Sequence, residues 1–268
     1  MITSETRILT THAGSLPRPP ELAELHGRRS RGEAVAAEEL RAIVERATAA
    51  SIAAQIDAGI DVGNDGEQAR ESFFTYVQHR MTGFGGNSRR ALMRDLTDHP
   101  DFIELALPRF ARMKVDLMGA PAAVAAVTYP DTAEVAAECA LVAGAPFVQT
   151  FMTAASPGIV VAAMEDRHYG SREEYIGAVA DAIRTEYRFI VDQGLLLQID
   201  APDLAMERHT LFADRPLGEF LGWVELVVDR INHALFHPDP DGTAVLPVDG
   251  RKLHLHSDWT GDPGDHVQ

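Results

Sequence analysis

The stretch LLLQIDAP, residues 195–202, decides the fold that the sequence predicts. Its mainly apolar run from Leu195 to Ile199 is bounded by Gly194 and ends abruptly in Asp200. Such a run is typical of a strand that is buried on both faces of a parallel sheet. A carboxylate directly after it is typical of a residue that a barrel strand delivers to the barrel mouth.

Strands and helices alternate on both sides of this stretch, which predicts parallel βα units and an α/β fold. A capping box of Ser171 and Glu174 marks the start of the helix before Gly194. Residues 81–94 read as a long polar excursion. The other expected strands are 8–11, 60–62, 122–128, 147–151 and 253–256, and the other expected helices are 38–58, 70–80, 132–142 and 217–235.

Polar residues that follow separate strands favour a TIM (β/α)8-type barrel over a doubly wound sheet. Ser15, Glu67, Asp200 and His256 each lie at such a strand end, and a barrel gathers these positions around one mouth. No GxGxxG fingerprint opens a helix. Only about six βα units are recognisable, so we expect a barrel that is shortened at its C-terminal end. No linker interrupts the chain, which predicts a single domain over residues 1–268.

The composition excludes several classes of partner. The formal net charge is −16 over 268 residues, which argues against nucleic acid and against anionic membrane surfaces. Cys139 is the single cysteine, so no intrachain disulfide is possible. The first residues lack the pattern of a signal peptide, and no apolar stretch is long enough to span a bilayer. We therefore expect a cytoplasmic protein.

Two short segments near the N-terminus carry candidate chemistry. Gly14 and Ser15 form a small-residue turn whose backbone N–H groups are suited to a carboxylate, although a purely structural turn explains them equally well. Glu67 follows the second expected strand in the segment Asp65-Gly66-Glu67. It is a candidate to bind an ammonium group or to act as a general base. An acidic helix start is the alternative.

Asp200, His254 and His256 carry the chemistry of the C-terminal half. A buried carboxylate without a partner is costly, so Asp200 is expected to be paired or functional. His254 and His256 are two residues apart on an expected strand and therefore share one face. This pair predicts either the beginning of a zinc site or two hydrogen-bonded imidazoles.

Four segments together resemble the catalytic domain of cobalamin-independent methionine synthase, and more closely its short, single-domain relatives. The wider superfamily includes epoxyalkane:coenzyme M transferase-like enzymes. The resemblance is carried, in chain order, by TTHAGSLPRP at 10–19, DGEQAR at 65–70, SREE at 171–174 before Tyr175, and LQIDAP at 197–202.

This resemblance implies a TIM barrel that transfers an alkyl or methyl group to a zinc-bound thiolate such as that of homocysteine, without cobalamin, in methionine biosynthesis. A small-molecule thiol and an alkyl donor are then the partners. His12, Gly14 and Ser15 would contact the amino-acid end of the thiol. Glu67 and Asp200 would bind its ammonium group as the catalytic carboxylates.

The metal ligands implied by the resemblance are His254, in the family's first ligand position, and His256, which stands where the family has a cysteine. The family's remaining glutamate and cysteine ligands have no counterpart in these 268 residues.

Two alternatives remain open at the level of sequence. One is a shortened relative without transferase activity that serves as a subunit or a small-molecule-binding protein. The other is a metal-free lyase that uses Glu67 and Asp200 as an acid/base pair.

The absent βα units would leave open strand edges, so a homodimer that covers them is expected.

Overall fold

A computed structural model describes residues 4–90, 92–110, 119–239, 242–246 and the backbone of 254–256. The strands are β1 (Val62–Gly63), β2 (Thr82–Arg89), β3 (Gly119–Thr128), β4 (Gln149–Ala155), β5 (Leu196–Asp200) and β6 (His254–His256). The helices are α1 (Pro20–Ser30), α2 (Ala37–Asp57), α3 (Arg94–Asp98), α4 (Pro100–Phe110), α5 (Ala133–Val142), α6 (Pro157–Ala163), α7 (Arg172–Asp192), α8 (Asp203–Met206) and α9 (Leu217–Phe236). Two short 3₁₀ segments, Thr75–His79 and Glu207–His209, complete the described elements.

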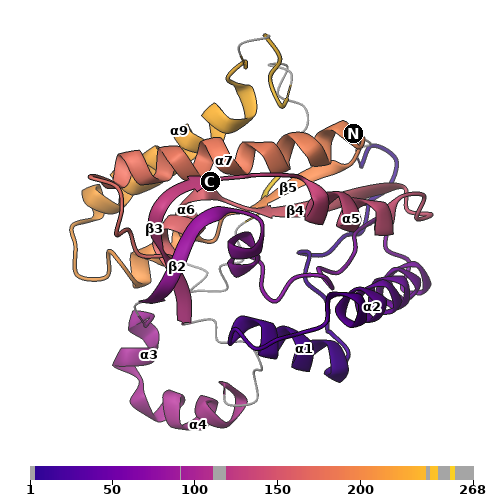
Figure 1. Ribbon diagram of the computed structural model, residues 1–268, viewed down its shortest axis with the longest axis horizontal. Helices are drawn as coiled ribbons and strands as arrows, with labels where there is room; N and C mark the ends of the chain where they lie inside the picture. Colours follow the sequence, from indigo (N-terminus) through magenta and orange to yellow (C-terminus); the bar gives the residue numbers. More distant parts are fainter. Residues whose placement is uncertain (1–3, 91, 111–118, 240–241, 247–253, 257–268) are drawn as a thin grey trace.

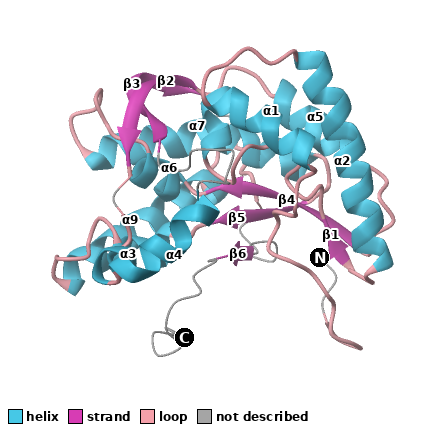
Figure 2. Ribbon diagram, turned by 90° about the horizontal axis from the view of Figure 1, so that it is seen from below, coloured by secondary structure: helices cyan, strands magenta, loops and turns pink. Residues whose placement is uncertain are grey.

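A parallel sheet with the strand order β1-β4-β5-β6 forms the centre of the fold (Figures 1 and 2). The extended segment at Thr10 runs beside β1, because its carbonyl accepts hydrogen bonds from the N–H groups of Asp61 and Val62. From this segment to β6, spatial neighbours follow chain order, apart from the β2–β3 pair. In a doubly wound sheet, the order of the strands reverses at the switch point, so spatial neighbours there do not follow chain order. The order therefore agrees with successive βα units, whereas closure into an eight-stranded barrel is not seen among the described residues.

The antiparallel pair β2–β3 is separate from the parallel sheet (Figure 2). Residues 81–94 were expected to be an irregular polar excursion, and β2 shows that this prediction was wrong for Thr82–Arg89. Three glycines in this strand hide its β character in the sequence. A side chain at Gly83 would meet the backbone of β3, with an added Cβ only 2.6 Å from the Ala126 carbonyl oxygen.

The predicted helix over 70–80 is replaced by bends and a 3₁₀ segment. The Ser72 hydroxyl accepts a hydrogen bond from the Thr75 N–H at 2.9 Å and lies 2.6 Å from the Thr75 hydroxyl. Such local side-chain contacts compete with regular helix hydrogen bonds.

Helices α7 and α9 pack against one another and close one side of the core. The N-terminus of α7 is capped as predicted, because the Ser171 hydroxyl accepts from the Glu174 N–H at 3.2 Å. The expected apolar stripe of α7 is buried; its fully enclosed members are Tyr175, Ile176, Val179, Ile183 and Ile190. Within the part of the chain that the structure describes, no helix has the length and apolarity to cross a membrane.

Replacing Gly158 with Ala is expected to destabilise the fold by about 1–3 kcal/mol, because the site is already filled. A Cβ there would lie 2.0 Å from Asp203 Oδ2 and 2.7 Å from a methyl group of Val227. The matched control is Gly177→Ala within α7, where no atom beyond the neighbouring residues and backbone of the helix itself lies within 4 Å of the added Cβ. Because Ala favours helix over Gly, the control is expected to stabilise by up to about 1 kcal/mol. Urea unfolding of both variants measures the contrast, and equal shifts would contradict the close packing at Gly158.

Candidate functional site

Gly14 brings the first loop against the ends of the central strands. Its φ of +135° lies in a region that favours glycine. A Cβ at this position would lie 2.8 Å from Thr153 Cγ2, 2.9 Å from Glu67 Oε1 and 3.7 Å from Gln198 Nε2. Only a residue without a side chain therefore allows this approach. Ser15, the next residue, is exposed.

His12 braces the same loop with both ring nitrogens. Its Nδ1 accepts from the Gly14 N–H at 3.2 Å, and its Nε2 lies 2.9 Å from Gln55 Oε1. Since Gln55 Nε2 donates to the Asn64 carbonyl, the facing Gln55 oxygen accepts and His12 Nε2 must donate. These contacts position Gly14, while a contact between His12 and substrate stays a prediction.

Glu67 is buried, with 1% of its surface exposed, at a backbone position with φ of +55°. A positive φ is uncommon outside glycine, and such conformations concentrate at functional sites. The Glu67 N–H donates to Asp65 Oδ1 at 2.9 Å, and its carbonyl accepts from Arg18 Nη2 at 3.0 Å. Together these contacts hold the backbone in this conformation.

The two carboxylate oxygens of Glu67 differ in their surroundings. Oε1 accepts a hydrogen bond from the Thr153 hydroxyl at 2.8 Å. Oε2 is buried and has no hydrogen-bond partner in the described structure. A buried carboxylate oxygen without a donor is unfavourable, so this atom is suited to a cationic group of a ligand.

Asp200 ends β5 and is 6% exposed. Its Oδ1 accepts from Gln198 Nε2 at 3.0 Å, and the same amide group donates to the Ala13 carbonyl. Gln198 therefore ties Asp200 to the loop that carries Gly14. Gln198 and Asp200 are two residues apart on one strand, so their side chains share a face.

The structure brings Gly14, Glu67, Gln198 and Asp200 together at the carboxyl ends of β1 and β5, with Ser15 adjacent in the loop. Their roles in binding and catalysis stay predictions. Sequence reasoning missed Gln198 and Thr153. The alternation along β5 indicates Gln198, because it lies on the face of Asp200.

The backbone of β6 continues the sheet beyond β5 at the same end. Its register pairs His254 with Gln198 and His256 with Asp200. The side chains of His254 and His256 lie outside the described residues, so the predicted zinc site is not tested. Among the side chains that are described, no cluster of three potential metal ligands occurs.

A second buried carboxylate, Asp203, lies three residues after Asp200 at the start of α8. Its Oδ1 accepts from the Ser156 hydroxyl, and Oδ2 has no hydrogen-bond partner. Burial raises the pKa of the Asp203 carboxyl to about 7, and the nearby charge of Glu207 adds to the rise. Asp203 was not among the predicted site residues.

Behind Glu67 lies a buried ion network of two arginines, two glutamates and one tyrosine. Arg70 donates to Glu138 Oε2 from Nη2 at 2.8 Å, and Arg80 donates to Glu138 Oε1. Arg80 Nη1 also lies 3.1 Å from Glu186 Oε1. Both guanidinium groups lie against the ring of Tyr76, with Arg70 4.3 Å and Arg80 4.5 Å from the ring centre. The positive charges of Arg70 and Arg80 keep the pKa of the Glu138 carboxyl below its ordinary value despite its burial.

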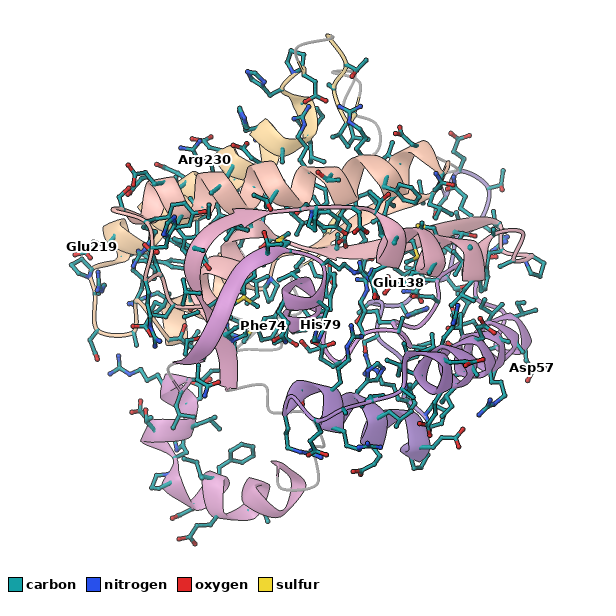
Figure 3. All side chains as sticks on the ribbon, in the orientation of Figure 1. Asp57, Phe74, His79, Glu138, Glu219 and Arg230 are labelled. Carbon is teal, nitrogen blue, oxygen red and sulfur yellow. The ribbon has the colours of Figure 1, made fainter. Side chains whose placement is uncertain are left out.

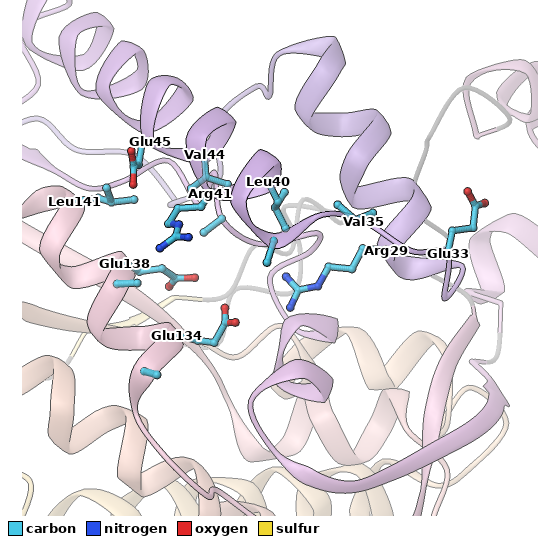
Figure 4. Close-up of a pocket in the computed structure, with 14 residues that line it drawn as sticks. Arg29, Glu33, Val35, Leu40, Arg41, Val44, Glu45, Glu134, Glu138 and Leu141 are labelled. Atoms are coloured by element: carbon cyan, nitrogen blue, oxygen red, sulfur yellow. The ribbon is translucent and has the colours of Figure 1, made fainter.

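A cavity of about 630 Å³ lies between α2 and α5 (Figure 4). Its walls combine apolar side chains such as Leu40, Val44 and Leu141 with Arg29, Arg41 and Glu134. Glu67 and Asp200 do not line it. The cavity and the site at the strand ends are therefore different places on the fold.

No family model and no curated protein matches the chain. Similar solved structures include a B12-independent methionine synthase from Shewanella sp. W3-18-1, in complex with selenomethionine. It is 22% identical, with a TM-score of 0.60 over 85% of this chain and 59% of that chain. A putative vitamin-B12-independent methionine synthase from Listeria monocytogenes is 15% identical, with a TM-score of 0.57 over 94% of this chain and 66% of that chain. The chain thus spans less than two thirds of both proteins, and the likeness shows a shared fold.

Proposed function

We propose that this protein binds the amino-acid end of a thiol such as homocysteine and transfers a methyl or alkyl group to its sulfur, as a cobalamin-independent methionine synthase-like enzyme. The sequence resemblance and the shared fold support this proposal. The consecutive strand order also supports placing these residues in a single (β/α)8-type barrel domain.

One observation carries the proposal. Glu67 presents a buried carboxylate oxygen without a partner, beside the Gly14 loop and close to Asp200. Two carboxylates at one mouth favour a cationic group, and an ammonium group would offset the cost of the unpartnered oxygen. The N–H of Ser15, in the small-residue turn, is suited to the carboxylate of the same ligand. Carboxylates on one side of the site and a hydrogen-bond donor on the other therefore match the ammonium and carboxylate groups of an α-amino acid.

Zinc is the metal that this reaction would require, and His254 and His256 are its proposed ligands. The pairing of β6 with β5 supports this assignment, because it sets both histidine positions beside Gln198 and Asp200. When bound, zinc lowers the pKa of a thiol and so supplies a thiolate nucleophile near neutral pH. The chain's own carboxylates would hold the amino-acid end and fix the direction in which the thiol points. Metal analysis of the purified protein distinguishes this mechanism from the metal-free acid/base alternative.

Calorimetric titration with L-homocysteine tests the proposal. Glu67→Gln and Asp200→Asn are each expected to weaken binding by about tenfold to a hundredfold, the usual range for a hydrogen bond to a charged group. Both variants should fold, and Asp200→Asn should melt at the same temperature or higher, because it removes a buried charge.

Glu134→Gln is the matched control for this titration. It makes the same acid-to-amide change in the wall of the cavity between α2 and α5, and it should leave affinity unchanged. No binding by the unmodified protein, or binding that only Glu134→Gln weakens, would refute the assignment of the site.

A further inference from the structure

Thr153, near the end of β4, contacts both Glu67 and the buried ion network. Its side chain is fully buried. Arg70 Nη1 lies 3.0 Å from the Thr153 carbonyl oxygen and 2.9 Å from its hydroxyl oxygen. On the other side, the hydroxyl lies 2.8 Å from Glu67 Oε1. Thr153 is therefore the link between the charged network and the candidate site.

The chemistry of Arg70 fixes the direction of these hydrogen bonds. A guanidinium group has donors and no acceptor, so the Thr153 oxygen must accept from Arg70. The single hydroxyl proton of Thr153 is then available for Glu67 Oε1. A threonine in a less restricted place could rotate its hydroxyl toward another acceptor, whereas here the donor from Arg70 opposes that rotation.

Arg70 is itself firmly held. Its Nε and Nη2 both donate to Glu138 Oε2, at 3.1 and 2.8 Å, and its guanidinium group stacks on the Tyr76 ring. The methyl group of Thr153 faces Gly14, where an added Cβ would come within 2.8 Å of it. Both sides of the threonine side chain are thus constrained by neighbours.

We infer that Thr153 is a positioning residue that occupies Oε1 of Glu67 and leaves Oε2 as the oxygen available to the ligand. This inference rests on the proposed function, since the ligand is taken to be an amino-acid thiol with an ammonium group. Thr153 acts only on the binding of the ammonium group. It does so through Glu67 and does not itself touch the ligand.

Binding by Thr153→Val and Thr153→Ser tests the inference with two ligands. One ligand is L-homocysteine, and the other is its desamino analogue, which keeps the thiol and the carboxylate but lacks the ammonium group. Thr153→Val removes the hydroxyl at nearly constant volume, and we expect it to weaken homocysteine binding about tenfold. Affinity for the desamino analogue should stay unchanged. Thr153→Ser restores the hydroxyl and should bind homocysteine nearly as the unmodified protein does.

An equal loss for both ligands would overturn the inference, because a general structural role produces that result. Unchanged homocysteine binding by Thr153→Val would also overturn it. Crystal structures of the unmodified protein and of Thr153→Val give a readout that needs no ligand: the Glu67 carboxylate should leave its position in the variant. If homocysteine does not bind the unmodified protein while this displacement occurs, the proposed function fails and the positioning role stands. An unmoved Glu67 would overturn the positioning role.

Discussion

Replacing Glu138 with Gln is expected to lower the free energy of unfolding by about 3–5 kcal/mol, the largest stability effect that the structure implies. Glu138 accepts from Arg70 and Arg80, and the three side chains are only 1–3% exposed. The neutral amide would leave the two buried guanidinium groups with one carboxylate, that of Glu186, in place of two. An uncompensated buried charge is far more costly than the lost hydrogen bonds alone.

The matched control is Glu219→Gln at the periphery of the fold (Figure 3). Glu219 pairs at 3.4 Å with Arg215, four residues earlier in the chain, and both side chains are about half exposed, at 52% and 53%. Such a pair contributes at most about 0.5 kcal/mol. Urea unfolding of both variants at neutral pH measures the difference. A loss below about 1 kcal/mol for Glu138→Gln would mean that water reaches the network.

The contribution of Asp203 to the stability of the fold is expected to fall as pH rises from about 4 to 7. The pKa of this carboxyl is about 7 in the folded protein and 3.8 as its ordinary value. Between these values the folded state keeps a proton that the unfolded state has released, so raising the pH favours unfolding. The difference between the two pKa values corresponds to a loss on the order of 4 kcal/mol across that window. Burial raises the pKa of Asp65 to about 6, which adds to the same trend.

Asp203→Asn isolates the contribution of this carboxyl. The amide keeps an oxygen that accepts from the Ser156 hydroxyl, and it does not ionise. We compare the free energy of unfolding of the unmodified protein with that of the variant. The value for the unmodified protein minus the value for the variant should decrease between pH 4.5 and pH 7.5, a window chosen around the two pKa values. A difference that stays constant with pH would show that Asp203 is ionised throughout.

The elements that the sequence predicted well are those with an uninterrupted periodic pattern. Helices α2, α7 and α9 and strand β5 lie within one or two residues of their expected bounds. The helices bury one regular face, so their period is visible in the residues, and β5 is visible as an apolar run bounded by Gly194 and Asp200. The pattern fails where tertiary contacts decide the structure. β2 is a strand because β3 lies beside it, and α1 has little apolar character to mark it.

The sequence predicted those residues of the site that directly follow an expected strand. Gly14, Glu67 and Asp200 could be singled out because a small or charged residue interrupts an apolar run. Arg70 and Thr153 could not, because their importance comes from partners 68 and 83 residues away in the chain. Arg70 was quoted only as part of a motif, and the expected strand 147–151 ended two residues before Thr153, which lies within β4. Pairing between distant residues is not encoded in any local pattern.

The buried ion network also constrains the order in which the chain can assemble. The Tyr76 hydroxyl reaches Glu186 across 110 positions, and Arg80 reaches Glu138 across 58. These distant segments must come together before either arginine can be buried with its carboxylate partners. A collapsed chain in which α5 and α7 had docked wrongly would bury these two cations without Glu138 and Glu186 to compensate them. The network therefore penalises misassembled compact states more strongly than an apolar core of the same size would.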